Sequence, residues 1–218
     1  MSLLTFIIPK KEGTVHFLTN YRKVNGQIVC KPFLIPRIAD TLQQLEGFTF
    51  ATTLDLNMGY FTTPLAECSK DVTTIVTEFG KFRYTCLPMG MVISGNVFQS
   101  KMYDLISDIK GVKTYIDDIL CIGKSSFADH IKQLEEIFCR FLKAGLKVNA
   151  AKYSFGLREI PYLRYIIFME GLKPDPKKIQ GIMDQTKPQT AKEMKSLIRM
   201  IQFYRDMCKN AVPTSYPH

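Results

Sequence analysis

The sequence has no C-x-x-C pair, no internal repeat and no low-complexity tract. No apolar segment approaches the roughly 20 residues of a membrane-spanning helix, and the opening MSLLTFIIPKK is too short for a secretory signal. Several of the six cysteines lie in apolar strand or helix patterns, which is typical of reduced, packed thiols. We therefore expect an intracellular protein, cytoplasmic or nuclear, without a membrane partner.

The chain does carry a basic excess and enough apolar residues for a core. It has 29 lysines and arginines against 20 aspartates and glutamates, a formal net charge of +9. This balance favours an anionic partner, most commonly nucleic acid, although many basic proteins bind none. With 218 residues, 46% of them hydrophobic, the chain is long enough for one domain or two small ones.

Short strand-like segments alternate with amphipathic helical ones, and this alternation predicts an α+β fold with antiparallel hairpins. TVHFLTNYRKVN and FTFATTLDL are typical of strands, and SGNVFQSKMYDLISDIK predicts a helix from Ser94. LKPDPKK is a candidate hinge, and Thr190 with Glu193 predicts the cap of a last helix.

A second long helix is predicted after residue 125. Ser126 and Asp129 fit a capping box, and Gly145 is placed to end the helix. Its apolar stripe is predicted to consist of Phe127, Ile131, Leu134, Phe138, Phe141 and Leu142.

Two adjacent aspartates, Asp117 and Asp118, interrupt the apolar run YIDDIL. A continuous strand would bury one carboxylate, so we predict that Asp-Asp is the two-residue tip of a hairpin between VKTYI and ILCIG. A charged surface turn is the plainer interpretation. However, Asp55 also ends a strand just before a glycine turn. Acids at converging strand ends supply the oxygen ligands that Mg²⁺ prefers, which favours a shared metal site.

Five segments follow one another in a recognisable order: TLDLNMGYFTTPL, LPMG with FQ, YIDDIL, AGLKVNAAK and YLRYIIFMEGLKPDPKKI. Together they resemble the successive motifs of a reverse transcriptase, and most closely those of long-terminal-repeat retrotransposons of the Ty3/gypsy type. The resemblance runs from about Phe6 to about Asp206. A single Y-x-D-D occurs by chance, but five motifs in order argue strongly against coincidence.

The resemblance implies a right-hand polymerase fold, in which an antiparallel palm sheet is backed by helices. Residues 1–54 and 66–86 would form the fingers, and residues 55–65 and 87–168 the palm. The reverse transcriptase domain would span about 6–168, and residues 169–218 would start the thumb. The implied activity is RNA-directed DNA polymerisation, with deoxynucleoside triphosphates and an RNA or DNA template with primer as partners.

The resemblance also implies roles for individual residues. Asp55, Asp117 and Asp118 would bind two Mg²⁺ ions, or Mn²⁺ in their place, and Lys152 would be a proton donor near the pyrophosphate. The nucleotide-binding residues would be Lys10, Lys11, Met58, Gly59 and Tyr60. Template and primer contacts would come from Gly90, Ser94, Phe98, Gln99, Tyr115, Leu163, Arg164 and Tyr165.

Some of these residues have a plainer interpretation. Lys10 and Lys11 fit a solvated turn equally well, and Tyr60, the implied barrier to a 2′-hydroxyl, fits a packed core tyrosine. Arg22 and Asn25 match family positions that are more structural than catalytic.

Five positions depart from the family pattern, which usually has arginine at His16, aspartate at Asn20, a small residue at Ile93, proline at Gly95 and glycine at Arg164. A histidine lacks the bidentate fork of arginine, and at position 164 the backbone is expected to need φ > 0. These departures favour an inactive retrotransposon remnant that only binds nucleic acid as the alternative function.

Two further expectations concern the chain as a whole. We find no ribonuclease H, integrase or protease motif, and a full-length relative is expected to carry ribonuclease H and integrase regions. The chain is therefore expected to be a polyprotein fragment or a decayed copy. A basic α+β protein unrelated to polymerases is a third possibility, which the ordered motifs nearly exclude.

Overall fold

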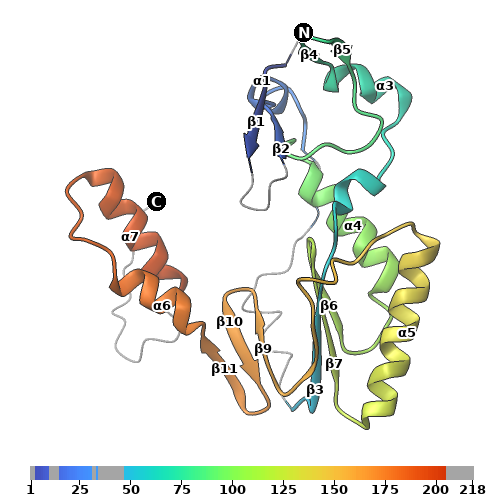
Figure 1. Cartoon of the computed structure of the whole chain (residues 1–218), viewed down its shortest axis with the longest axis vertical. Helices are drawn as coiled ribbons and strands as arrows, with labels where there is room; N and C mark the ends of the chain where they lie inside the picture. Colours follow the sequence, from blue (N-terminus) through green and yellow to red (C-terminus); the bar gives the residue numbers. More distant parts are fainter. Residues whose placement is uncertain (1–2, 10–14, 31–32, 34–46, 205–218) are drawn as a thin grey trace.

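The computed structural model describes residues 3–9, 15–30, 33 and 47–204 (Figure 1). Its centre is a four-stranded antiparallel sheet in the order β6-β7-β3-β8. The strands are β6 (Val112–Tyr115), β7 (Asp118–Gly123), β3 (Phe50–Asp55) and β8 (Ser154–Leu157). The β-branched and aromatic residues of FTFATTLDL form β3, as predicted.

Helices α4 (Ser94–Ile106) and α5 (Phe127–Lys143) cover one face of this sheet (Figure 1). The predicted ends of α5 are confirmed: the Ser126 hydroxyl accepts the Asp129 N–H at 3.2 Å, and Gly145 has φ 70° just past the helix. The apolar core beneath the two helices consists of Leu54, Leu56, Phe98, Met102, Ile106, Val112, Ile119, Cys121, Leu134, Ile137 and Phe141.

The predicted apolar stripe of α5 is only partly correct. The buried residues are His130, Leu134, Ile137 and Phe141, whereas Phe138 and Leu142 are exposed. The buried face begins at a histidine, which a hydrophobicity pattern does not place inside. Its imidazole is accommodated because its Nε2 lies 2.8 Å from the Thr52 hydroxyl.

A second antiparallel sheet packs beside β3 and leads into the last two helices (Figure 1). It contains β9 (Glu159–Tyr162), β10 (Tyr165–Phe168) and β11 (Gly171–Pro174), followed by α6 (Pro176–Met183) and α7 (Ala191–Phe203). The core that joins the two sheets consists of Phe48, Ala51, Leu120, Ile122, Ile160, Tyr162, Tyr165, Ile167 and Tyr204.

The segment LKPDPKK is a capped strand-to-helix junction. Asp175 accepts the Lys177 N–H at 3.0 Å, and Pro176 occupies the first turn of α6. At the start of α7, the predicted capping box of Thr190 and Glu193 is confirmed.

A smaller lobe lies beyond α4 (Figure 1). It contains β1 (Thr5–Pro9), β2 (Val15–Thr19), α1 (Arg22–Asn25), α3 (Glu67–Lys70), β4 (Ile75–Thr77) and β5 (Gly80–Phe82), with the 3₁₀ turn η2 (Asp71–Thr73). The 3₁₀ turn η1 (Gly59–Thr62) packs against α4. The predicted strand through NYRKVN is wrong beyond Thr19, because the Asn20 side chain accepts the Arg22 N–H at 3.2 Å where α1 begins. Among the described helices, none is both long enough and apolar enough to cross a bilayer.

Candidate active site

Asp55 and Asp118 lie side by side at one end of the central sheet. Asp55 is the last residue of β3, Asp118 is the first of β7, and the two are cross-strand partners. Asp118 also pairs with Tyr115, so the two-residue connection of the β6–β7 hairpin is Ile116–Asp117. The predicted Asp117–Asp118 tip is therefore wrong by one residue, because Asp118 belongs to a ladder with strands on both sides.

A side chain of α4 holds the Ile116–Asp117 turn in an unusual backbone conformation. Ile116 has φ 55°, a left-handed backbone that β-branched residues rarely adopt. The buried Gln99 of α4 accepts the Ile116 N–H at 2.5 Å and donates to the Thr114 hydroxyl at 2.9 Å. Gln99 thus fixes the hairpin that carries Asp117.

The three carboxylates repel one another. Burial, and then the negative charges of Asp118 and Asp55, together raise the pKa of Asp117 to about 6. Burial and then Asp55 also raise the pKa of Asp118, whereas Lys152 lowers it. Lys152 Nζ lies 3.8 Å from Asp55 Oδ2 and offsets part of the negative charge. This end of the sheet is therefore suited to hold positive charge.

The donor set fits a divalent cation by its chemistry. Oδ1 of Asp117 is buried, and no described residue hydrogen-bonds to it. Carboxylate oxygens are the ligands that Mg²⁺ prefers. In the side-chain positions of the described residues, however, no three histidine, cysteine or acidic side chains converge in a metal-binding arrangement. The residue types fit a cation, while their present arrangement does not form a complete site.

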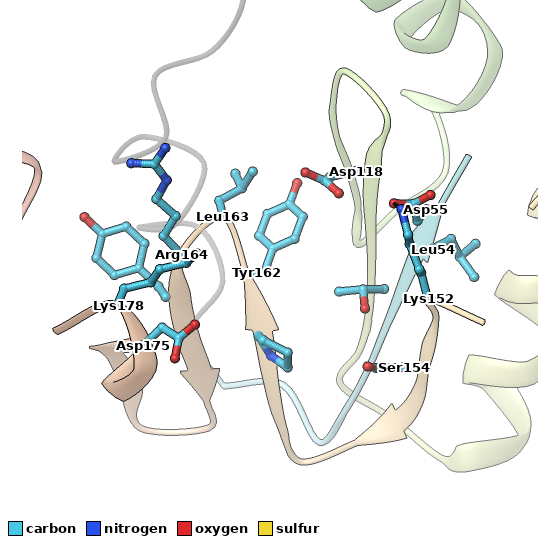
Figure 2. A pocket seen from close by; sticks show the side chains of 13 residues that line it. Leu54, Asp55, Asp118, Lys152, Ser154, Tyr162, Leu163, Arg164, Asp175 and Lys178 are labelled. Carbon is cyan, nitrogen blue, oxygen red and sulfur yellow. Dashed lines mark ion pairs between the residues drawn. The ribbon is translucent and has the colours of Figure 1, made fainter. Parts of the chain in front are cut away.

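A cleft of about 300 Å³ opens between the two sheets beside these acids (Figure 2). Asp118, Asp55 and Lys152 lie on one side of it, and the β9–β10 turn and the start of α6 lie on the other. Asp117 does not line this cleft. The lining residues are Thr53, Leu54, Asp55, Asp118, Lys152, Ser154, Pro161, Tyr162, Leu163, Arg164, Tyr165, Asp175 and Lys178.

The β9–β10 turn is left-handed at both central residues, with φ 47° at Leu163 and 72° at Arg164. The expectation of φ > 0 at position 164 is confirmed. The Arg164 guanidinium carbon lies 5.0 Å from the centre of the Phe203 ring, within range of a cation–π interaction. Its carbonyl accepts the Asp175 N–H at 3.1 Å and the Tyr204 hydroxyl at 3.2 Å. Arg164 thus connects the turn to the end of α7.

The predicted nucleotide-binding residues that the structure describes lie at η1. Met58 is exposed with φ 53°, and a Cβ on Gly59 would lie 2.5 Å from Phe98 Cζ. The Tyr60 ring packs on Phe98 with centroids 5.1 Å apart. Burial, and then the charge of Asp117, together raise the pKa of Tyr60 to about 12. Tyr60 therefore lies close enough to Asp117 for the carboxylate charge to affect its pKa.

The segment before α4 is held by buried and side-chain hydrogen bonds. Asn25 donates to the Gly90 carbonyl at 3.0 Å and accepts the Val92 N–H at 2.9 Å. The buried Ser94 hydroxyl donates to the Pro88 carbonyl at 2.7 Å. These contacts fix the shape of the loop through Gly90, which has φ 96°.

Lys10 and Lys11 lie outside the described residues, as does the side chain of His16.

Seven of the lining residues were not predicted, and Tyr162 and Lys178 are two of them. Tyr162 lies within the YLRY segment, and the alternation along β9 places it on the same buried side as Ile160. This period-two alternation is the sequence signal that could have predicted a buried Tyr162. Lys178 lies in the first turns of α6, a helix that the sequence patterns did not reveal.

An antiparallel sheet backed by two helices, with acids at the tips of adjacent strands, is the arrangement of a polymerase palm. The chain matches the model of the family described as "Reverse transcriptase (RNA-dependent DNA polymerase)" over residues 8–167, and it belongs to this family. The α+β fold with palm and fingers is therefore confirmed.

Known relatives are retroelement polyproteins. The chain is 31% identical over 212 residues to the retrovirus-related Pol polyprotein from transposon 412 of Drosophila melanogaster, covering 94% of this chain and 17% of that relative. It is 29% identical over 210 residues to the Pro-Pol polyprotein of Simian foamy virus type 1, covering 96% and 18%. The chain thus spans less than a fifth of either relative.

Two solved structures of foamy viral protease-reverse transcriptase are also similar. The complex with dsDNA superposes with a TM-score of 0.87 at 27% identity, covering 98% of this chain and 44% of that chain. The complex with an RNA/DNA hybrid superposes with a TM-score of 0.82 at 26% identity, covering 94% and 28%.

Proposed function

We propose that this chain performs template-directed nucleotidyl transfer to a primer 3′-hydroxyl as an RNA-directed DNA polymerase. Its partners would be an RNA or DNA template with primer and deoxynucleoside triphosphates. The observation that carries the proposal is the cross-strand pairing of Asp55 with Asp118, beside a buried Asp117 carboxylate oxygen that has no hydrogen-bond partner among the described residues. Residues 1–54 and 66–86 are proposed as fingers, 55–65 and 87–168 as palm, and 169–218 as the start of a thumb.

In this proposal, Asp55, Asp117 and Asp118 hold divalent cations, Mg²⁺ or Mn²⁺. Such cations activate the attacking hydroxyl and stabilise the leaving pyrophosphate. Lys152, 3.8 Å from Asp55, is placed to neutralise charge and to donate a proton to the leaving group. Tyr60, packed on Phe98, forms the floor under the incoming sugar, and the amides of Met58 and Gly59 face its triphosphate.

The primer end would lie in the cleft between the acids and the β9–β10 turn, against Leu163, Arg164 and Tyr165. Gln99 holds the hairpin of Tyr115 and Asp117 in place, and Gly90 and Ser94 shape the loop that faces the template. Catalysis of this kind depends on placing the reacting atoms to within about 1 Å, so these supporting contacts matter as much as the acids.

A second candidate function is binding of nucleic acid without catalysis. Arginine at position 164, where the family pattern has glycine, favours it. The charge of +9 would then carry the binding, which should weaken steeply with salt and depend little on sequence.

Primer extension separates the two functions. The protein is incubated with poly(rA)/oligo(dT), dTTP and either Mg²⁺ or Mn²⁺, and affinity for the same primer–template is measured from 50 to 200 mM salt. Extension that Asp118→Asn abolishes supports the polymerase. Salt-dependent binding without extension supports the binding-only function, and no binding at 50 mM salt overturns both.

A further inference from the structure

A second cavity, of about 190 Å³, lies between α4, the turn η1 and the chain that follows α5. It shares no lining residue with the cleft beside the aspartates. The lining residues from α4 recur every three or four positions, so one face of this helix forms a wall of the cavity. The described lining residues are Thr62, Thr63, Phe98, Lys101, Met102, Leu105, Ala144 and Leu146.

The lining of this cavity is apolar with a single charge. Phe98 and Met102 are both 1% exposed, and the half-buried Leu105 and Leu146 pack against the same core. Lys101 is exposed, and it is the one charged residue among the described residues that line the cavity. The cleft beside the aspartates is different, because acids and bases line it in equal number. The second cavity therefore favours a ligand that is apolar and carries a negative charge.

The donors and the size of the cavity narrow the class of ligand. The Thr62 hydroxyl already donates to the Gly59 carbonyl at 2.6 Å, whereas the Lys101 ammonium offers three donors to an anion. An apolar cavity of about 150 Å³ holds benzene, so this one has room for one aromatic ring and a short acidic tail. A nucleic-acid strand is a poorer match, because its successive phosphates would meet only one ammonium.

Phe98 connects this cavity to the nucleotide side of the site. A Cβ on Gly59 would lie 2.5 Å from Phe98 Cζ, and the Tyr60 ring packs on Phe98 with centroids 5.1 Å apart. A ligand ring beside Phe98 would restrict movement of this side chain into the cavity. It would thereby hold Gly59 and Tyr60 in place.

We propose that the cavity binds a small aromatic carboxylate, with its ring against Phe98 and Met102 and its acid on Lys101, and that this ligand strengthens nucleotide binding. The binding itself stands on the cavity alone, whereas the effect on the nucleotide rests on the proposed function. Because such coupling is reciprocal, the nucleotide strengthens binding of the carboxylate by the same factor.

The test titrates 4-phenylbutyrate, and its neutral counterpart 4-phenylbutyramide, into the parent, Lys101→Met and Lys132→Met. Binding is followed by NMR of ¹³C-labelled methionine methyl groups. The ring current of the probe should shift the methyl signal of Met102, which Met102→Leu assigns, while the exposed Met183 of α6 is the reference. Lys132→Met is the matched control, because it removes an exposed charge of α5 that does not line the cavity.

We expect a saturable shift of the Met102 signal with a Kd of roughly 0.1–1 mM for 4-phenylbutyrate, and no shift of Met183. Lys101→Met should bind this acid about threefold to tenfold more weakly and the amide as the parent does. Lys132→Met should match the parent for both probes. In single-turnover primer extension, saturating 4-phenylbutyrate should lower the nucleotide KM of the parent about twofold to fivefold.

The absence of a saturable Met102 shift overturns the binding site. Equal losses in the two lysine variants, or equal losses for the acid and the amide in Lys101→Met, overturn it as well. Saturable binding with an unchanged nucleotide KM overturns the coupling. A parent that extends no primer overturns the proposed function and with it the effect on the nucleotide, while the NMR titration still decides whether the cavity binds the carboxylate.

Discussion

The central sheet is built differently at its helix-covered face and at its carboxylate end. Beneath α5, the fully buried His130 lies 2.8 Å from the Thr52 hydroxyl, which also accepts the Gly156 N–H at 3.0 Å. The hydroxyl has a proton and a second lone pair left for His130 Nε2, so both polar groups are satisfied in either direction of this bond. Burial lowers the pKa of His130, so the ring is neutral at pH 7.

Near the carboxylates, by contrast, buried polar groups are left without hydrogen-bond partners. Asp117 Oδ1 and, in β9 of the neighbouring sheet, the Tyr162 hydroxyl are buried without hydrogen-bond partners among the described residues, and Ile116 is left-handed. Each such feature costs of order 1–3 kcal/mol and persists only where the surrounding structure enforces it. The difference indicates that this end was shaped for a ligand, and the following variants test that contrast.

The largest effect is expected for Asp117→Asn. Extension should fall about 10³-fold or more, because an amide supplies no negative charge to a cation. The free energy of unfolding of Asp117→Asn, in contrast, should rise relative to the parent at pH 7. Because the pKa of Asp117 is raised to about 6, the folded state binds more protons than the unfolded state between about pH 4 and 6. The parent therefore loses stability as the pH rises through this range.

Asp117→Asn lacks that ionisation and should be more stable than the parent at pH 7, by roughly 1 kcal/mol once solvent screening is considered. Urea unfolding at pH 4.5 and 7 measures the difference. A variant that is less stable than the parent at pH 7 would contradict the assignment of Asp117 as a strained ligand.

Gln99→Met should break the support of the hairpin with little change in volume. It removes the acceptor of the Ile116 N–H and the donor to Thr114, so the left-handed turn can relax. We expect a loss of about 1–3 kcal/mol in stability and a fall in kcat of about 10²-fold, with little change in nucleotide KM. Single-turnover incorporation separates the two constants.

Gln133→Met is the matched control for Gln99. The Gln133 amide of α5 donates an exposed hydrogen bond to the Lys110 carbonyl at 3.0 Å, at the other end of β6 from Ile116, and its oxygen lies 4.0 Å from Cys121 Sγ. Stability and kcat should stay close to those of the parent. An equal loss in both variants would show that the support of Ile116 is not special.

Gly59→Ala should destabilise the nucleotide side of the site. The new Cβ would lie 2.5 Å from Phe98 Cζ, and the Phe98 ring is fully buried. Overpacking of this kind costs about 1–3 kcal/mol and should raise the nucleotide KM.

Gly95→Ala is the control, because it places a methyl group in open space within α4. It should stabilise the folded protein by about 0.5–1 kcal/mol. Urea unfolding measures both effects. If the urea midpoints of Gly59→Ala and Gly95→Ala shifted in the same direction relative to the parent, the packing argument would be refuted.

Features that depend on adjacent residues could be predicted from the sequence. β3, the start of α5 at Ser126 and the capping box at Thr190 follow from residue propensity and hydrogen bonds within one turn. The left-handed backbone at Arg164 also could be predicted, because the family pattern that the sequence resembles has glycine at this position.

Features set by a third segment could not be predicted. The hairpin tip moved to Ile116–Asp117 because Asp118 pairs with β3 as well as with β6. The buried face of α5 includes His130 because Thr52, 78 residues away, supplies its partner. Likewise, whether the Tyr162 hydroxyl finds a partner depends on how β9 packs against the central sheet.

The neutral His130 predicts a pH effect opposite to that of Asp117. With its pKa lowered, the folded state binds fewer protons than the unfolded state, so stability should fall as the pH drops below about 6.5. In the Asp117→Asn background we expect a loss of up to roughly 1 kcal/mol between pH 7 and 5.5. His130→Gln in the same background should lack this slope in urea unfolding, and an unchanged slope would exclude His130 as its source.

The smallest net effect is expected at Arg164, where two contributions oppose each other. Glycine would relieve about 1 kcal/mol of left-handed strain but remove the cation–π contact with Phe203, worth about 0.5–1 kcal/mol. Arg164→Gly should therefore unfold within about 0.5 kcal/mol of the parent. Arg164→Ala keeps the strain and loses the contact, so it should be less stable than Arg164→Gly by roughly 1 kcal/mol.

The same two variants measure what Arg164 does for the primer. Its guanidinium is directed to Phe203 and its carbonyl to Asp175 and Tyr204, so removal of the side chain loosens the end of α7. We expect faster hydrogen exchange in α7 for both variants, with unchanged exchange in β3. Because only glycine also relaxes the turn, extension by Arg164→Gly should exceed that by Arg164→Ala. Equal extension by both would mean that strain at this turn has no part in primer placement.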